Sequence, residues 1–96
     1  MGSDKQFVLV VYDISNDRRR TRLHDRLLDY GSPVQYSVFE CLLEAKDLQK
    51  MKSAMRRIIR PRKDNVRMYY LCAGCLKKTE TFAGQAAEDI PGALVV

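Results

Sequence analysis

The sequence predicts an α+β sandwich, in which two helices cover one face of a small β-sheet. Three observations favour this fold class. An apolar run near the start is typical of a strand, two later segments have helical spacing of their apolar residues, and two further segments look extended. These segments alternate along the chain with short connections, which is the pattern of a layered α+β domain. The 96 residues are enough for one hydrophobic core, so we expect one domain.

The first strand is predicted over Phe7–Tyr12, an apolar run with three valines that is typical of a central strand buried on both faces. A helix is predicted over Asp17–Tyr30, because Ser15 and Asn16 are both good N-cap residues and Asp17 suits the first turn of a helix. Gly31 is expected at the position just after the helix, where glycine commonly ends it, and Pro33 would prevent the helix from resuming.

The second half of the chain repeats this alternation. Val34–Leu43 is predicted to be extended, with a bend or a break into two strands near Ser37 because ten residues are long for one strand. A second helix is predicted over Ala45–Ile59 and a last strand over Val66–Cys72. The resulting order, β-α-β-β-α-β, predicts a ferredoxin-like sandwich with an antiparallel sheet, which we place in residues 1–79. The helical stripe of the second helix is Leu48, Met51, Met55 and Ile58.

The remainder of the chain is expected to be a tail with one or two short edge strands. Residues 80–96 form this predicted tail, and Leu94–Val96 would pair on the same sheet or on that of a neighbouring subunit. The helices cover only one face of the sheet, yet Phe7–Tyr12 is apolar at every position. The second face therefore needs a cover, and in so small a chain a second copy is the natural one, so we expect a homodimer.

The charge of the chain is basic and unevenly distributed. The net charge is +5 and the isoelectric point is about 9.3. Residues 14–67 hold 14 Lys or Arg against 7 Asp or Glu, whereas residues 80–96 hold no basic residue. This balance indicates a polyanionic partner, most simply RNA or DNA, or else a solvated surface that keeps a small protein soluble; composition leaves both open.

Several protein classes are excluded or disfavoured. No apolar run approaches the roughly 18–20 residues of a membrane span, so no membrane association is expected. The start resembles no signal peptide, and the expected location is the cytoplasm. A nucleotide cofactor is disfavoured because the chain has no glycine-rich phosphate loop. His24 has no obvious nucleophile as a partner in the sequence, so we expect an ordinary surface histidine.

Cys72 and Cys75 form a lone CxxC pair. A structural zinc site needs four ligands, and Cys41 and His24 are the only other soft candidates. Redox-active pairs usually open a helix, whereas this pair is predicted to end a strand. We therefore expect ordinary free thiols.

Asp13 is the strongest candidate for chemistry. It follows a buried strand and precedes a helix start, where functional groups commonly gather. A carboxylate there suits Mg²⁺, a cation that lowers the pKa of a coordinated water and stabilises a phosphodiester transition state. One carboxylate is a poor site, but a two-fold axis close to Asp13 would bring two together. The alternative is that Asp13 hydrogen-bonds backbone amides of the turn.

Arginine is concentrated at the start of the first helix. Arg18, Arg22 and Arg26 share one face, while Arg19 and Arg20 point elsewhere. Arginine opposes the dipole at a helix start, and phosphate contact would explain its presence. A second basic set would contact DNA or simply stabilise a helix end; it comprises Arg56, Arg57, Arg60, Arg62 and Lys63.

Aromatic side chains on the predicted strands are either core residues or platforms on which bases stack. An RNA-recognition motif is disfavoured because its characteristic basic-Gly-aromatic run is absent. The candidates are Tyr12, Tyr36, Phe39, Tyr69 and Tyr70.

Several of these segments together resemble one known family. Val10–Ser15 (VVYDIS), Arg20–Leu23 (RTRL), Gly31 and Val34–Glu40 (VQYSVFE) are similar to motifs of the small CRISPR-associated endoribonucleases, the second of the two universal CRISPR adaptation proteins. The resemblance covers about residues 7–72, and the pairing of the YDI strand end with the QYSVF strand is its most specific part. The Cys72–Cys75 pair is not a hallmark of that family.

The resemblance implies a ferredoxin-like homodimer in which Asp13 and Asp13 of the second subunit bind Mg²⁺ or Mn²⁺ and act in catalysis. It also implies that Tyr12, Ser37 and Phe39 support activity, as do Arg20 and Arg22. With the helix spacing, it makes four arginines candidates for nucleic-acid binding: Arg18, Arg20, Arg22 and Arg26.

Two functions follow from the resemblance. The first is a metal-dependent endonuclease that hydrolyses single-stranded RNA, duplex DNA or both during spacer acquisition in antiviral defence. The second is a non-catalytic homodimeric scaffold that binds DNA and bridges integrase dimers in the adaptation complex. A plain dimeric RNA-binding domain is the third hypothesis.

Overall fold

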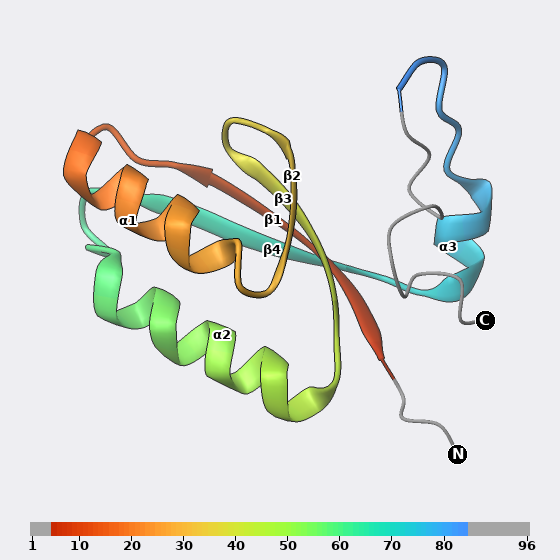
Figure 1. The fold of residues 1–96 in the computed structure, drawn as a ribbon, viewed down its shortest axis with the longest axis horizontal. Coiled ribbons are helices and arrows are strands. Elements are labelled where there is room, and N and C mark those ends of the chain that lie inside the picture. The colour runs from red at the N-terminus through yellow and green to blue at the C-terminus, as the bar shows by residue number, and fades with distance from the viewer. Residues whose placement is uncertain (1–4, 85–96) are drawn as a thin grey trace.

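A computed structural model describes residues 5–84 of the chain. Four antiparallel strands form one sheet, and two helices pack side by side on one of its faces (Figure 1). This is the predicted ferredoxin-like arrangement with one additional short helix. The elements in chain order are β1 (Gln6–Asp13), α1 (Asp17–Leu27), β2 (Gly31–Gln35), β3 (Val38–Leu43), α2 (Ala45–Ile58), β4 (Asn65–Leu71) and α3 (Ala73–Lys78).

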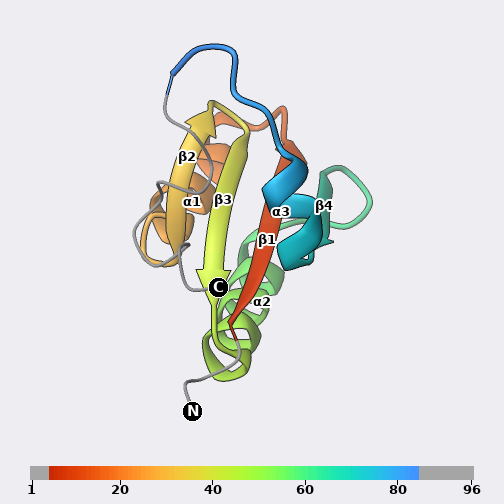
Figure 2. The same cartoon turned by 90° about the vertical axis from the view of Figure 1, so that its right-hand side faces the viewer.

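The apolar run at the start of the chain is a central strand, as predicted. The strand order is β2-β3-β1-β4, so β1 pairs with β3 on one side and with β4 on the other (Figure 2). Val8, Val10 and Tyr12 point toward the helices and are buried in the core. The alternate residues of β1 therefore point to the opposite face.

The core lies between the sheet and the two long helices. Leu23 and Leu27 are the buried residues of α1, while the buried residues of α2 are the four apolar positions predicted from its spacing. β3 contributes Phe39, Cys41 and Leu43 from the middle of the sheet. Burial of these apolar stripes is the main stabilising contribution to such a small domain.

The predicted long extended segment is two strands with a turn at Tyr36 and Ser37, close to where the break was expected. Tyr12 stabilises this turn, because its backbone amide donates to the Ser37 carbonyl at 3.0 Å and its hydroxyl donates to the Tyr36 carbonyl at 2.9 Å. β2 begins earlier than predicted and includes Pro33, which is tolerated because β2 is an edge strand.

Gly31 was predicted to follow the last residue of the first helix and to end it, and this prediction was wrong. The first helix ends at Leu27, three residues before the predicted end, and Gly31 is the first residue of β2 and has no positive φ. A Cβ atom there would lie 2.4 Å from the Glu40 carbonyl oxygen and 2.5 Å from the Cys41 sulfur. Glycine is needed because β2 and β3 approach closely at this point.

The region directly after β4 contains a short helix that was not predicted. This helix, α3, lies at the opposite end of the sheet from the start of α1 (Figure 1). The predicted strand at Leu94–Val96 lies outside the described residues. Within residues 5–84, no helix is long and apolar enough to cross a membrane.

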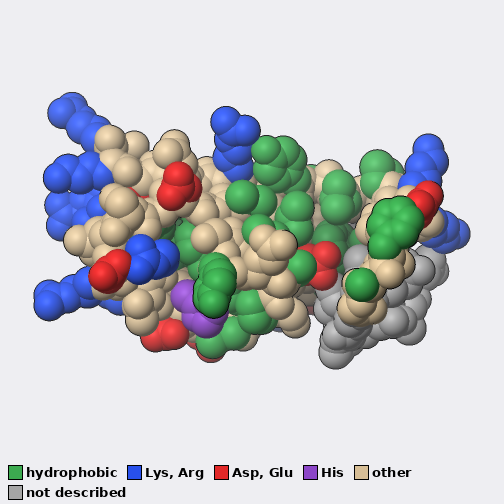
Figure 3. Space-filling view, turned by 90° about the horizontal axis from the view of Figure 1, so that it is seen from above, with side chains coloured by type: hydrophobic (Ala, Val, Ile, Leu, Met, Phe, Trp, Pro, Cys, Tyr) green, Lys and Arg blue, Asp and Glu red, His purple; other side chains and the backbone are tan. Residues whose placement is uncertain are grey.

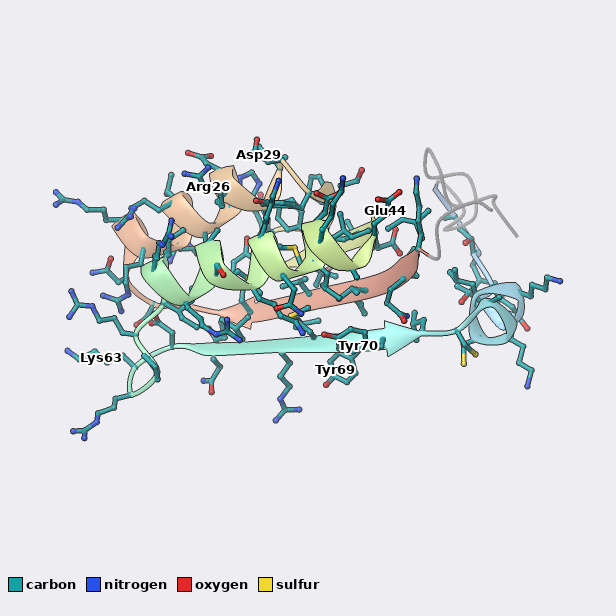
Figure 4. The ribbon with its side chains drawn as sticks, turned by 90° about the horizontal axis from the view of Figure 1, so that it is seen from below. Arg26, Asp29, Glu44, Lys63, Tyr69 and Tyr70 are labelled. Atoms are coloured by element: carbon teal, nitrogen blue, oxygen red, sulfur yellow. The ribbon has the colours of Figure 1, made fainter. Side chains whose placement is uncertain are left out.

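The face of the sheet opposite the helices, which we call the open face, is largely apolar. Alternation places Leu9 and Val11 of β1 there, beside Tyr69 of β4, whose ring projects away from the helices (Figure 4). Leu9 and Val11 are half-buried, and Tyr69 is 45% exposed. The long helices α1 and α2 both lie on the other face of the sheet (Figure 4).

Candidate functional site

Asp13 is the last residue of β1, and its side chain is exposed. Alternation along β1 places it on the open face with Leu9 and Val11. Among residues 5–84, no hydrogen bond or ion pair involves the Asp13 carboxylate. The structure therefore does not support the alternative that Asp13 caps backbone amides of the turn, and its oxygens are available to a ligand.

Two polar residues of β4 lie beside Asp13 on the open face. Asn65 is its direct cross-strand partner, and Arg67, opposite Val11, is the diagonal neighbour. Arg67 also donates a hydrogen bond to the hydroxyl of Tyr69 at 3.3 Å. Neither Asn65 nor Arg67 was predicted to have a role, because only the register between β1 and β4 brings them next to Asp13.

The loop that follows Asp13 is held by polar contacts with the start of α1. The Asn16 side chain accepts a hydrogen bond from the amide of Arg19 at 2.9 Å, so Asn16 is the N-cap and Ser15, the other candidate, is not. The Arg20 guanidinium donates to the Ile14 carbonyl at 2.9 Å and forms an ion pair with Asp17. Arg20 therefore fixes the chain that connects Asp13 to α1, whatever further contact it makes with a phosphate.

Two of the predicted supporting residues lie in the core next to the end of β1. Tyr12 and Phe39 are buried in the core with their rings stacked, 6.5 Å between centroids. Burial raises the pKa of Tyr12, against a smaller opposing effect of the Arg20 charge, so Tyr12 serves as a neutral hydrogen-bond donor. Ser37 contributes its backbone carbonyl to Tyr12. Tyr12 and Phe39 are therefore placed to stabilise the end of β1 by packing.

The two basic segments of the sequence converge at the same end of the molecule as Asp13. They line a hollow of about 460 Å³ where the start of α1 meets the end of α2. Figure 3 shows a cluster of Lys and Arg side chains at this end, with further ones at the middle and at the opposite end. The hollow lies in the helix layer, whereas Asp13 lies on the open face, so one chain presents its carboxylate and its arginines on adjoining surfaces. The arginines that line the hollow are Arg18, Arg19, Arg22, Arg57 and Arg60.

A second, larger groove of about 850 Å³ continues between α1 and α2 and is lined by Arg22, Arg26, Lys50 and Arg57 among other residues. Arg26 is exposed and lies 3.5 Å from the carboxylate of Asp29 at the end of α1 (Figure 4). Such exposed pairs are weak and exchange readily. The face that carries Arg18, Arg22 and Arg26 is thus solvent-accessible, as their spacing predicted.

Arg19 differs from its neighbours because it is bound within the protein. Its guanidinium donates two hydrogen bonds to the buried carboxylate of Asp64, each at 2.9 Å. The Arg60 amide donates to the same carboxylate at 2.8 Å. The Arg19 hydrogen bond and the Arg60 amide hold the pKa of Asp64 below its ordinary value. This ion pair joins the start of α1 to the α2–β4 loop, the two segments that flank the hollow.

The side chains around Asp13 offer the oxygen ligands that a hard divalent cation prefers, but they offer too few of them. Carboxylate and amide oxygens, here those of Asp13 and Asn65, are typical Mg²⁺ ligands. Residues 5–84 contain no group of three or more His, Cys, Asp or Glu able to hold a metal ion. One described chain thus offers a partial site, which a second copy of Asp13 would extend.

His24 contacts the Phe39 ring edge-on, with 5.3 Å between centroids.

Comparison with known proteins identifies the family. Residues 6–79 match the family described as CRISPR associated protein Cas2. The chain is 36% identical to the CRISPR-associated endoribonuclease Cas2 of Nitratidesulfovibrio vulgaris over 100 aligned residues, which cover 99% of this chain and 98% of the relative. It is 34% identical to CRISPR-associated endoribonuclease Cas2 3 of Synechocystis, with 92% and 96% covered. A Thermus thermophilus relative, 40% identical over 68% of this chain and 72% of its own, is named an endonuclease.

Solved structures agree with these sequence relationships. The Cas2 structure from Streptococcus pyogenes superimposes with a TM-score of 0.70 at 30% identity, covering 80% of this chain and 99% of the other. A chain from a partial Cas6-RT-Cas1–Cas2 complex superimposes with a TM-score of 0.72 at 27% identity, covering 85% and 96%. The sequence motifs, the ferredoxin-like fold and these matches lead to one conclusion: the chain belongs to the Cas2 family of CRISPR-associated proteins.

Proposed function

We propose that this chain is a metal-dependent endonuclease of CRISPR spacer acquisition and that its reactive carboxylates are the Asp13 residues of a homodimer. The observation that carries the proposal is the free, exposed carboxylate of Asp13 at the edge of an apolar face. A carboxylate with no partner among residues 5–84 is available for a ligand. The names of the relatives, endoribonuclease and endonuclease Cas2, support the reaction class.

The homodimer is supported by the open face. Leu9, Val11 and Tyr69 form an apolar surface on which a second copy would exclude water. Asp13 is at the end of β1 on this same face, so a two-fold axis near that end would bring the two carboxylates together. Like charges so close would repel unless a cation lay between them.

In this arrangement a bound Mg²⁺ or Mn²⁺ would activate water and neutralise charge on the phosphodiester. The chain itself would supply the remaining elements. The Asp13 carboxylates would hold the cation, and Arg20 would keep the loop after Asp13 in place through the Ile14 carbonyl. Arg18, Arg22 and Arg26 would bind backbone phosphates of RNA or duplex DNA, and Arg67 would contribute positive charge beside the carboxylate.

A second function is favoured by a different observation. The similar Cas2 chain from the partial Cas6-RT-Cas1–Cas2 complex was solved together with other CRISPR proteins. This chain would likewise join a Cas1 integrase and hold a DNA duplex with its basic end. That scaffold role requires the arginines and the dimer but not the Asp13 carboxylate.

A cleavage assay distinguishes the two functions. Wild type and Asp13→Asn are incubated with single-stranded RNA and with duplex DNA, with and without Mg²⁺, and Asp25→Asn on exposed α1 is the matched control. We expect metal-dependent cutting by wild type and the control, and a loss of at least about 100-fold in Asp13→Asn. Equal activity in Asp13→Asn would overturn the nuclease proposal. Cutting by none of the proteins, with duplex binding intact, would favour the scaffold.

A further inference from the structure

The CxxC pair lies at the junction between β4 and α3, and the structure changes its interpretation. Cys72 is the N-cap residue of α3 and Cys75 lies in that helix, so the pair does open a helix, contrary to the sequence-based expectation. Both side chains are exposed, and their sulfur atoms are 3.5 Å apart. The two thiols thus face each other and are open to solvent.

We propose that Cys72 and Cys75 are a reversible dithiol–disulfide pair that reacts with low-molecular-weight disulfides such as oxidised glutathione. A disulfide bond requires a sulfur–sulfur distance of about 2.05 Å. The present contact needs to shorten by only about 1.5 Å, within reach of side-chain rotation. The ring that forms would contain only the Ala73–Gly74 dipeptide between its cysteines and would fix the turn that leads from the sheet into α3.

The reaction balances as two thiol–disulfide exchanges. The Cys72 thiolate attacks one sulfur of oxidised glutathione, forms a mixed disulfide and releases one glutathione thiolate. The Cys75 thiolate then attacks the Cys72 sulfur, closes the internal disulfide and releases the second glutathione thiolate. Two protein thiols are oxidised, one glutathione disulfide is reduced to two thiols, and the two protons go to solvent or to the released thiolates.

The contacts of the pair favour this order of attack. The amide and thiol of Cys75 lower the pKa of Cys72, whereas hydrogen bonding to Cys72 raises the pKa of Cys75. Cys72 is therefore the thiol with the larger thiolate fraction, as expected of an attacking cysteine.

The third cysteine is an internal control. Cys41 is fully buried in the core, and burial together with the charge of Glu40 raises the pKa of its thiol to about 11. Because the pKa of this thiol is about 11 rather than the ordinary 9.0, roughly 100-fold less thiolate is present at neutral pH, and the surrounding core shields the sulfur further. Cys41 is thus expected to remain unreactive in the folded protein.

A metal site is the competing interpretation, because two thiols are half of a tetrahedral zinc site. Within residues 5–84, however, no third ligand joins the pair. The two exposed sulfurs in contact therefore favour disulfide formation, and zinc binding becomes an outcome that the test must detect.

The test treats the full reduced chain with oxidised glutathione, stops the reaction with iodoacetamide and measures the intact mass under non-reducing conditions. We expect wild type to lose two hydrogen atoms, to accept no label while folded and to remain uncrosslinked between chains. Cys75→Ser should stop as a glutathione adduct on Cys72, because the resolving thiol is gone. Cys41→Ser should behave as wild type.

Three results would overturn the proposal. The first is that wild type retains glutathione on either cysteine without closing the ring. The second is that it forms disulfides between chains. The third is that it resists both reagents until a chelator is added, which would indicate a bound metal. Circular dichroism of each variant confirms that it is folded before its thiols are assayed. None of these readouts depends on nuclease activity or on nucleic-acid binding.

Discussion

The two ends of β1 are built differently. At the Asp13 end, the ion pair between Arg19 and Asp64 and the contacts of Arg20 tie α1 to the neighbouring loops. At the other end, β4 leads into α3, a six-residue helix that contributes no buried residue. The difference suits the two proposed chemistries, because phosphodiester hydrolysis needs groups held in fixed positions, whereas thiol exchange needs solvent access and tolerates movement.

Reversing charge at each end gives the largest expected contrast. Replacing Arg18 and Arg22 by Glu should weaken RNA or duplex DNA binding by roughly 100-fold at low salt, because two phosphate contacts become repulsive. Replacing Lys77 and Lys78 of α3 by Glu makes the same change in net charge and should cost less than about threefold. Fluorescence anisotropy over a salt series measures both. Equal losses for the two variants would mean that overall charge, not the basic end, binds the nucleic acid.

Removing the buried ion pair comes next. The Asp64 carboxylate accepts two hydrogen bonds from Arg19 and one from the Arg60 amide, and the neutral amide of Asp64→Asn cannot replace all three as a charged acceptor. The free energy of unfolding, measured by urea denaturation, should therefore fall by about 1–3 kcal/mol. The native pKa of Asp64 is lowered, so its stabilising contribution is complete above about pH 4 and is lost as the pH falls through the lower native value. The wild type and the variant should therefore converge in acid. A constant difference down to pH 2 would contradict this assignment.

Most of the fold was predictable because its signals are local. The apolar run of β1, the start of α1 beside a capping residue and the stripe of α2 each depend on a few neighbouring residues, and each was predicted as the strand or helix that the structure shows. The short helix α3 was missed because six residues carry too little periodicity to distinguish a helix from a turn. The register that places Asn65 and Arg67 beside Asp13 had no local signal, because it is set by strand pairing across the sheet.

A smaller effect is expected from the close approach of β2 and β3, which lies nearer the Cys72 end. In Gly31→Ala, the new methyl group would collide with the Glu40 carbonyl and the Cys41 sulfur, so β2 must shift. We expect a loss of about 1–2 kcal/mol in unfolding free energy, with nucleic-acid binding at the Asp13 end unchanged. Gly74→Ala is the matched control, since its Cβ would contact only the Cys72 sulfur at 3.8 Å. A stable Gly31→Ala would mean that the edge strand adapts easily.

The smallest effect concerns Glu40, which lies between the two ends on the open face opposite Leu9. Burial raises its pKa, so the charged form is disfavoured in the folded chain. The stabilisation from the uncharged Glu40 side chain is therefore complete below the pKa that Glu40 has in the unfolded chain. It is lost as the pH rises through the raised pKa of the folded chain. Glu40→Gln should stabilise the chain at pH 7 by roughly 0.5 kcal/mol and show no such gain at pH 4. A loss of stability at pH 7 would mean that the charge is paired.

Two Asp13 carboxylates from two chains are proposed to form one metal site at the end of β1 that leads into α1. Titration of the full chain with Mn²⁺, followed by electron paramagnetic resonance of the free ion, measures the number of sites directly. We predict one ion for every two chains, loss of that site in Asp13→Asn, and no change in Cys75→Ser. One ion per chain, or an undiminished site in Asp13→Asn, would contradict the shared carboxylate site.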